Sequence, residues 1–266
     1  YRENYYYVLE AKLVLHPKVV VSIMTEFVEN DGNEMDKQDC ERKACARLME
    51  KLKRQFPRLN ICLCADSLHA CEPFFRKCEE HQWQYLLRFK EGSIPTVGSE
   101  YRTLREIEHN RKETRKENGR YWYDHVCDID YKGYKINLME YGEEVKKIIK
   151  RGMHKIEQEE KKHFWFLTSL PVSQKNVSDL VARGRMRWKI ENEGFNMQKR
   201  NGYYLEHLFS KKYQGIKNHY YLIQIGHMIS EILESWAQLW EGIRLSIEQK
   251  HQKLKDSFKI VRLKEY

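Results

Sequence analysis

The sequence has no Cys-x-x-Cys pair, although it contains seven cysteines. Zinc ribbons are built on such pairs, and a disulfide framework uses an even number of cysteines. The set therefore argues against both, and we expect reduced thiols, as in the cytosol. Cys62 and Cys64 fall in the apolar run 60–65, where small side chains are typical of a buried central strand.

A hydrophobic run long enough to cross a bilayer is also absent. The most apolar long stretch, residues 220–239, contains Gln224, His227, Glu231 and Glu234, which make it too polar for a membrane span. No signal peptide is visible, and we find neither an internal repeat nor a low-complexity tract. We expect a cytoplasmic protein without a membrane partner.

A positive charge is the clearest feature of the composition. The sequence carries 48 Lys and Arg against 39 Asp and Glu, a formal net charge of +9, and is 41% hydrophobic and 33% charged. These proportions are typical of a globular protein. A surface of this sign attracts polyanions, of which nucleic acid is the commonest, but many basic proteins bind none. Charge alone therefore does not decide the partner.

The first third of the sequence alternates between strand and helix patterns. Residues 5–15 and 19–28 are rich in β-branched and aromatic side chains and predict an antiparallel hairpin. Apolar residues recur every four positions over 36–56, which predicts an amphipathic helix. A strand at 60–65, a short helix and a strand at 83–89 follow. This order predicts an α/β fold, a mixed sheet with helices packed on its faces.

The rest of the sequence divides into an insertion and a return to the core. Residues 92–162 hold a polar stretch and two alternating strands, so they predict a β-rich insertion after a first core part at 1–91. The mixed charges of 143–162 favour a solvated helix over a binding site. Residues 163–266 then predict a core strand at 163–170, an arginine-bearing helix at 176–197, and a helical region at 216–254 whose apolar stripe is Ile223, Ile232, Trp236, Trp240 and Ile243.

Asp66 stands at the end of the apolar strand. Ligand crevices form at strand ends in open α/β sheets, so a carboxylate there could reach a metal ion while its backbone stays fixed. The alternative is that Asp66 only caps the helix that follows. For an isolated Asp, the cap is the more common outcome.

A second candidate lies in the arginine-bearing helix. Arg183, Arg187 and Glu191 are four residues apart, so on one continuous helix they share a face and place a carboxylate beside two cations. The alternative is a surface Arg–Glu pair, which is worth roughly 0.2–0.5 kcal/mol and occurs on many ordinary helices.

Several segments in the same order resemble the DDE-type insertion-sequence transposases. The run RWKIENEGFNMQK, from Arg187 to Lys199, is similar to the family's signature helix, in which a Tyr, an Arg, the catalytic Glu and a Lys recur at set intervals. Arg187 and Glu191 match, whereas Gly184 stands where the Tyr would be and Lys199 falls one residue late. Glu193 is the alternative if a one-residue insertion shifts the register. Further similar segments are LEAKLV (9–14), TEFVEN (25–30), KQDCE (37–41), ADSLHA (65–70) and GYYLEH (202–207).

The resemblance implies a ribonuclease-H-like core with a β-rich insertion between the second catalytic Asp and the Glu. It also implies DNA strand cleavage and strand transfer supported by two Mg²⁺ or Mn²⁺ ions, which prefer carboxylate ligands on rigid elements. Asp66 matches the second catalytic Asp and would help to hold the metal ions. Glu191 matches the catalytic Glu and would complete a metal site.

The resemblance further implies double-stranded DNA, as transposon ends and target, as the partner in a bacterial cytosol or nucleoid. Arg187, Lys189 and Lys199 would lie along DNA phosphates. Trp188 would either stack on an exposed base or pack in the core, and we favour the core because buried aromatic residues are the more common. The family generally works as a homodimer across paired ends.

The first catalytic Asp of the family lies on a strand that precedes the hairpin. The present sequence opens on residues that match the hairpin itself, and neither Glu3 nor Glu10 sits where that Asp would be. We therefore expect an N-terminally truncated chain with an uncovered sheet edge. Two other functions stay open: a non-catalytic basic DNA-binding remnant, and a metal-dependent nuclease of the same fold.

This chain is accordingly expected to show little or no strand cleavage by itself. Loss of a central carboxylate costs several kcal/mol of transition-state stabilisation, and each ~1.36 kcal/mol is about tenfold in rate. Incubation with Mg²⁺ or Mn²⁺ and DNA that contains transposon ends measures this. Robust cleavage would show that the truncation is misjudged.

Overall fold

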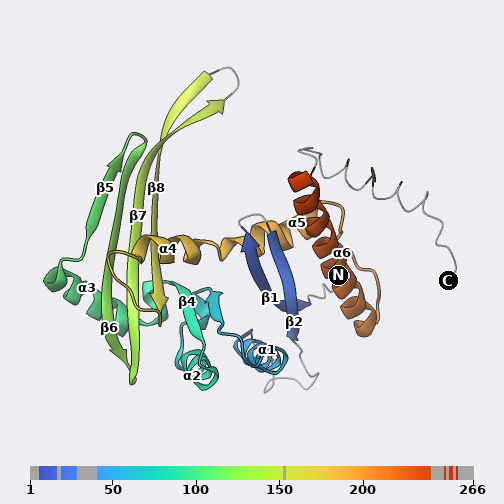
Figure 1. Cartoon of the computed structure of the whole chain (residues 1–266), viewed down its shortest axis with the longest axis horizontal. Helices are drawn as coiled ribbons and strands as arrows, with labels where there is room; N and C mark the ends of the chain where they lie inside the picture. The colour runs from blue at the N-terminus through green and yellow to red at the C-terminus, as the bar shows by residue number, and fades with distance from the viewer. Residues whose placement is uncertain are drawn as a thin grey trace, which may run out of the picture. The chain divides into compact units, whose positions relative to one another are not determined.

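The computed structural model describes residues 6–16, 19–28, 41–151 and 154–240, together with positions 249, 252, 253 and 256 (Figure 1). These residues belong to two compact units. The sheet unit contains residues 1–11 and 24–187, and the C-terminal unit contains residues 12–23 and 188–266. None of the described helices is both long and apolar enough to cross a membrane.

The predicted hairpin is present as strands β1 (Tyr7–His16) and β2 (Val19–Val28), which form a two-stranded sheet. Helix α1 (Glu41–Gln55) follows, and its buried residues Ala44, Leu48 and Leu52 confirm the predicted spacing of four. The predicted start of this helix, residues 36–40, lies outside the described residues. Buried Glu26 of β2 accepts a hydrogen bond from Arg47 of α1 at 2.6 Å, which fixes the helix against the strand.

The main sheet has six strands in the order β3-β4-β8-β7-β6-β5. Strand β3 pairs in parallel with β4, and every other neighbouring pair is antiparallel, so the prediction of a mixed sheet is confirmed. The strands are β3 (Cys62–Ala65), β4 (Gln84–Phe89), β5 (Lys112–Lys116), β6 (Gly119–Tyr131), β7 (Tyr134–Arg151) and β8 (His154–Thr168).

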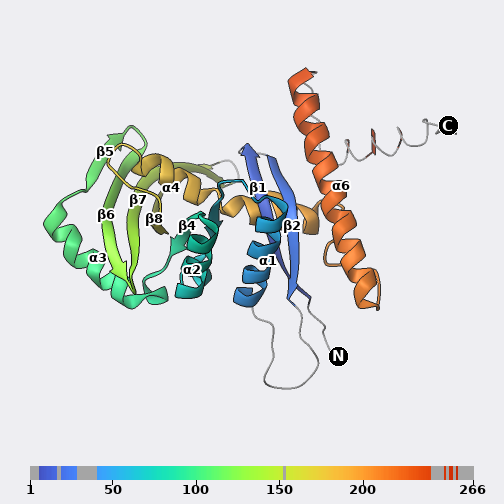
Figure 2. The same cartoon turned by 60° about the horizontal axis from the view of Figure 1, so that its bottom comes forward.

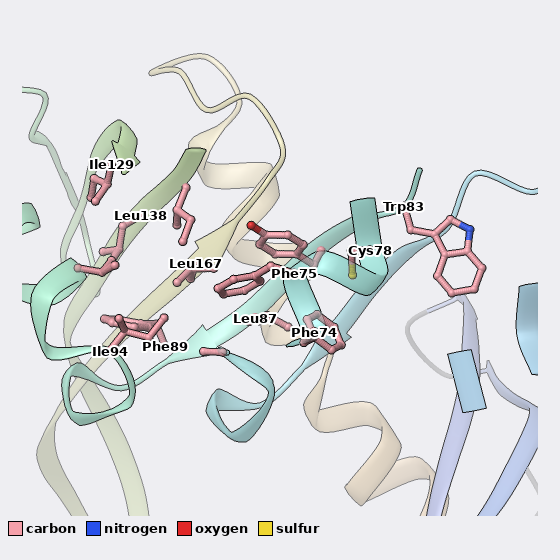
Figure 3. Close-up of a cluster of buried hydrophobic side chains, with 14 of the residues drawn as sticks. Phe74, Phe75, Cys78, Trp83, Leu87, Phe89, Ile94, Ile129, Leu138 and Leu167 are labelled. Carbon is pink, nitrogen blue, oxygen red and sulfur yellow. The ribbon is translucent and has the colours of Figure 1, made fainter. Parts of the chain in front are cut away.

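Helices cover both faces of this sheet (Figure 2). Strand residues point alternately to the two faces, so Leu87 and Leu167 join α2 in one core cluster while Leu86 and Phe166 face α4 in another. Figure 3 shows the first cluster, with Phe75 of α2 lying beside Leu87 and Leu167. The helical elements of the unit, besides α1, are η1 (Ser67–His69), α2 (Glu72–His81), η2 (Glu91–Ser93), α3 (Pro95–Glu108) and α4 (Val177–Arg185).

The prediction of a solvated helix at 143–162 is wrong. Residues 143–151 and 154–162 belong to β7 and β8, which run beyond β5 as a long two-stranded arm in Figure 1. Opposite charges face each other across the ladder: Lys162 contacts Glu143 at 3.1 Å, and Lys161 contacts Glu144 at the same distance. Ion pairs across neighbouring strands stabilise a sheet, just as ion pairs between residues four apart stabilise a helix. A run of mixed charges therefore does not by itself distinguish a strand from a helix.

The prediction of a buried central strand at 60–65 is also wrong in its burial. Within the described residues β3 pairs only with β4, so it is an edge strand of the six-stranded sheet. Cys62 and Cys64 are exposed there, and Leu63 is half-buried. An apolar run indicates a strand, but it does not determine whether both neighbours are present.

The C-terminal unit contains a π-helical turn (Ile190–Phe195), α5 (Asn196–Arg200) and α6 (Tyr213–Trp240). The predicted apolar stripe of the last helix is only partly correct. Ile223 is 6% exposed but Ile232 is 56% exposed, because nine residues at about 100° each place them on opposite sides of a helix. The side chains of Trp236 and Trp240 and all of Ile243 lie outside the described residues.

Replacing Gly142 by alanine is expected to destabilise the sheet unit. Gly142 of β7 lies opposite Trp122 of β6, and a Cβ at this glycine would fall 1.9 Å from the indole ring. The ring and its neighbours must therefore shift, which costs about 1–3 kcal/mol of the free energy of unfolding. Urea unfolding followed by tryptophan fluorescence measures the change.

Gly92→Ala is the matched control, because nothing lies within 4 Å of a Cβ at that position. Replacing a glycine by alanine without strain usually stabilises a protein slightly, by about 0.4–1 kcal/mol. Equal stability of the two variants would contradict the close packing of Trp122.

Candidate active site

Asp66 directly follows β3 and is the N-cap of the short helix η1. Its Oδ1 accepts a hydrogen bond from the Leu68 amide at 3.0 Å. The capping alternative is therefore observed, yet it engages one oxygen only. Within the described residues the second oxygen makes no hydrogen bond, and the side chain is half-buried. The cap fixes the carboxylate and leaves an oxygen that could bind a cation.

A second carboxylate lies near Asp66. His69 of η1 is 5% exposed, and its Nε2 lies 3.6 Å from Oε1 of Glu41 at the start of α1. Burial lowers the pKa of His69, and the negative charges of Asp66 and Glu41 oppose this effect. Burial, the Cys71 thiol and the same two carboxylates raise the pKa of Cys45 to about 12. Two carboxylates therefore lie near this end of β3, and carboxylate oxygens are ligands that a hard cation prefers.

Glu41 and His69 were not among the predicted site residues. Both lie in segments that resemble the transposase family, 37–41 and 65–70, so the signal was present in the sequence. Glu41 was missed because acidic residues are common at the start of a helix, where they interact favourably with the helix dipole.

The predicted continuous helix at 176–197 is interrupted. Helix α4 ends at Arg185, and the amides of Met186 and Arg187 donate to the carbonyls of Arg183 and Gly184 three residues earlier. A different helical geometry begins at Ile190. Arg183, Arg187 and Glu191 therefore do not belong to one continuous α-helix, because the tighter turn after α4 interrupts it.

Arg183 and Arg187 each lie near a side chain of the main sheet. A hydrogen bond with Cys64 and the nearby charge of Arg183 lower the pKa of the Cys62 thiol on β3. Burial and the neighbouring guanidinium of Arg187 lower the pKa of Arg88 on β4 to about 10. Cations from α4 and β4 therefore gather on the sheet face that α4 covers.

Gly184 occupies the position at which the family has a Tyr. A Cβ there would lie 2.6 Å from the ring of Phe166 on β8, so α4 approaches the sheet too closely for a side chain. This close approach explains the departure from the family pattern in physical terms.

Glu191 lies in the π-helical turn Ile190–Phe195. The amide of Asn196 donates to the carbonyl of Glu191, five residues earlier instead of four. Such a turn holds one more residue than an α-helical turn and shifts everything after it by one position. One extra residue in this turn matches the one-residue offset of Lys199 from the family pattern. The burial agrees, since Gln198 is fully buried and the Lys199 side chain is 41% exposed.

The remaining predicted site residues lie around this turn. Lys189 pairs with Glu193 at 3.0 Å, and Lys199 pairs with Glu206 at 2.8 Å. Trp188 is 49% exposed, so the preferred interpretation of this residue as part of the core is wrong.

A family model described as the transposase DDE domain matches residues 36–229, which is more than half of the chain. The chain belongs to the DDE transposase family. The match includes both Asp66 and Glu191, and it confirms the resemblance and the ribonuclease-H-like fold class. A search of curated proteins found no match to the transposase.

The donor chemistry of the transposase suits a hard divalent cation. Mg²⁺ prefers oxygen ligands and usually binds through one or two carboxylates together with water and substrate phosphates. Within the described residues no three His, Cys, Asp or Glu side chains gather into a complete metal site.

A buried polar cluster lies in the same unit as Glu191. Burial raises the pKa of Glu231 on α6 to about 7, with a further contribution from Glu193, while the Val20 amide and Lys12 oppose the shift. Burial lowers the pKa of His227 to about 4, with a contribution from Lys12. Both groups are therefore held close to their neutral forms.

Replacing Glu231 by glutamine is expected to stabilise the transposase increasingly as the pH rises from 4.5 to 7. The unfolded carboxyl group ionises above its ordinary pKa of 4.5, whereas the folded one stays protonated up to about 7. The wild type therefore loses stability across this window, and the variant does not. The difference in the free energy of unfolding should grow by roughly 3 kcal/mol between pH 4.5 and pH 7.

Urea unfolding at several pH values measures this difference. Glu206→Gln, at a glutamate that is 70% exposed in the same unit, serves as the control and should show no comparable trend. A difference that is constant with pH would contradict a protonated Glu231.

Proposed function

We propose that this protein catalyses metal-dependent DNA strand cleavage and strand transfer of an insertion sequence in the cytoplasm. Asp66 and Glu191 are the catalytic carboxylates and ligands of Mg²⁺ or Mn²⁺. The observation that carries the proposal is the position of Asp66: it follows β3, with the Glu41 carboxylate nearby and one oxygen engaged in the cap, inside the region that matches the transposase DDE domain.

The bound ions would supply an activated hydroxyl nucleophile and relief of the charge that develops on the phosphorus. Asp66 contributes a carboxylate whose backbone is fixed by β3 and by the cap to Leu68. Glu191 contributes a second carboxylate from a π-helical turn, a geometry that is rare and often found at functional sites. Both groups are thus presented by ordered backbone, which catalysis by positioned ligands needs.

DNA is the substrate that the charges favour. Arg88 and Arg187 repel each other on the α4 face of the sheet, and a phosphate between or beside them would relieve that repulsion. Lys189 and Lys199 are half-exposed or exposed and could exchange their carboxylate partners for DNA phosphates. Exposed Trp188 offers a surface for stacking on a base.

The proposal includes a homodimer. Helix α6 buries Tyr220 and Ile223 on one side, yet it exposes an apolar stripe at spacings of three and four on another. A helix that is apolar on more than one side is usually covered, and this spacing suits a second helix. The stripe consists of Leu222, Ile225, Ile229 and Ile232.

Asp66→Asn and Glu191→Gln are each expected to lower the rate of end cleavage by about 100-fold or more, because a neutral amide is a poor ligand for a divalent cation. The rates are measured in a form of the transposase that cleaves transposon ends, together with DNA binding, which should persist. Joined products in addition to cut ones distinguish a transposase from a nuclease.

Glu193→Gln is the matched control, because Glu193 lies in the same turn and pairs with Lys189. Its cleavage rate should stay near that of the wild type. Loss of cleavage in Glu193→Gln but not in Glu191→Gln would move the catalytic role to residue 193. Unchanged cleavage in Asp66→Asn would reject the catalytic assignment and leave a DNA-binding protein.

A further inference from the structure

We propose that Gln198, Gln224 and Lys12 are positioning residues that hold the π-helical turn and thereby set the orientation of Glu191. The inference rests on the proposed catalytic role of Glu191. All three residues belong to the C-terminal unit, and none of them is expected to touch DNA or the metal ions.

A reciprocal amide pair connects the end of the turn to α6. Nε2 of Gln198 donates to Oε1 of Gln224 at 2.8 Å, and Nε2 of Gln224 donates to Oε1 of Gln198 at 3.0 Å. The two residues are 0% and 4% exposed. Buried amides with both hydrogen bonds made fix the separation and the rotation of the elements that carry them, since any shift leaves polar atoms unsatisfied.

His227 completes the set of partners for Gln198. Its Nδ1 lies 3.1 Å from Nε2 of Gln198, whose other hydrogen is used by Gln224. Nδ1 must therefore act as the acceptor, which requires a neutral imidazole. Burial lowers the pKa of His227 to about 4, so the imidazole is neutral at physiological pH. Both Nε2 and Oε1 of Gln198 are therefore hydrogen-bonded.

Lys12 of β1 holds the other side of the turn. Its side chain lies against Gly194, where a Cβ would fall 3.1 Å from the lysine Cε. Its Nζ donates to Oε1 of Gln224 at 3.1 Å and lies 6.0 Å from the centre of the Phe195 ring. One lysine thus joins the middle of the π turn to the amide pair that follows it.

The hydrogen bonds of Gln198, Gln224 and Lys12 determine which side chain after the π turn is exposed. A π turn is rarely stable without outside support, because it interrupts the regular pattern of helical hydrogen bonds. If the turn relaxed to an α-helical one, the residues after it would rotate by about 100° and Gln198 would leave its buried partners. The buried amide pair therefore stabilises the register in which Gln198 is inside and Lys199 is outside.

The experiment replaces the two glutamines by methionine, singly and together. Each single variant leaves one buried amide without its partner, so stability and positioning should both suffer. The double variant places two apolar side chains of similar size together, so the urea midpoint should return toward that of the wild type. The directional hydrogen bonds remain absent, so the turn should remain mispositioned.

Two readouts separate positioning from stability. In a form of the transposase that cleaves DNA, the double variant should keep KM for DNA and lose about tenfold or more in kcat. By hydrogen exchange of the 266-residue chain, amides of residues 190–200 should exchange about tenfold or more faster than in the wild type. Gln214→Met, at an exposed glutamine of α6, is the matched control and should change neither readout.

Lys12→Met provides a test that does not depend on the buried pair. It removes one donor at a half-buried position and should raise exchange in residues 190–195 without loss of the fold. Recovery of kcat together with the urea midpoint in the double variant, or unchanged exchange in all variants, would overturn the proposal.

Glu191→Gln is measured in parallel so that the two proposals can fail separately. Full cleavage by Glu191→Gln would reject the catalytic role of Glu191, while the exchange data would still decide whether the network holds the turn. Loss of cleavage in Glu191→Gln with normal kcat and exchange in every glutamine variant would reject the network alone.

Discussion

The antiparallel ladder between β4 and β8 is the constraint on which the sheet unit depends. It joins Leu87 to Leu167, and the hydroxyl of Thr168 donates to the carbonyl of Tyr85, 83 positions earlier, at 2.6 Å. Arg88 strengthens the connection by donating to the carbonyl of Trp165, a paired residue of β8, and extends it by donating to the carbonyl of His163 beyond the paired residues. The whole insertion is thereby closed onto β4, at an entropic cost that grows only slowly with loop length. Helix α4 and the arginines after it reach the sheet face because β8 ends there.

Local patterns predicted the elements whose stability is local. The hairpin, the spacing of Leu48 and Leu52 in α1, and strand β4 all follow from period and residue type, and the structure confirms them. The charged residues of β7 and β8 were misjudged because their partners lie across the ladder, outside any sequence window. The exposure of Cys62 could not be predicted either, because burial of a strand depends on which strands pair with it.

The candidate site shows the same division. The motif around Asp66 and the step from Arg187 to Glu191 could be recognised from residue types and spacing, and the family match includes them. The one-residue offset of Lys199 could be seen but not explained, because a π turn has no clear signature in sequence. The amide pair of Gln198 and Gln224 was missed since two buried glutamines look, in sequence, like ordinary polar helix residues.

The cap and the ligand are not exclusive roles for Asp66. A carboxylate has two oxygens, and the hydrogen bond to Leu68 uses one of them. In the proposed site the cap would also serve metal binding, because it fixes the direction of the carboxylate. In the proposed network, a buried amide pair holds the turn that carries Glu191.

Protein cleavage by bound Fe²⁺ tests most directly whether Asp66 and Glu191 serve one divalent-cation site. Fe²⁺ takes the place of Mg²⁺ at oxygen-rich sites, and with ascorbate and peroxide it produces radicals that cut the nearest backbone. One shared site predicts cuts beside both residue 66 and residue 191, and excess Mg²⁺ should suppress both together. Cuts beside only one of the two residues, or cuts that Mg²⁺ does not suppress, would contradict a shared metal site.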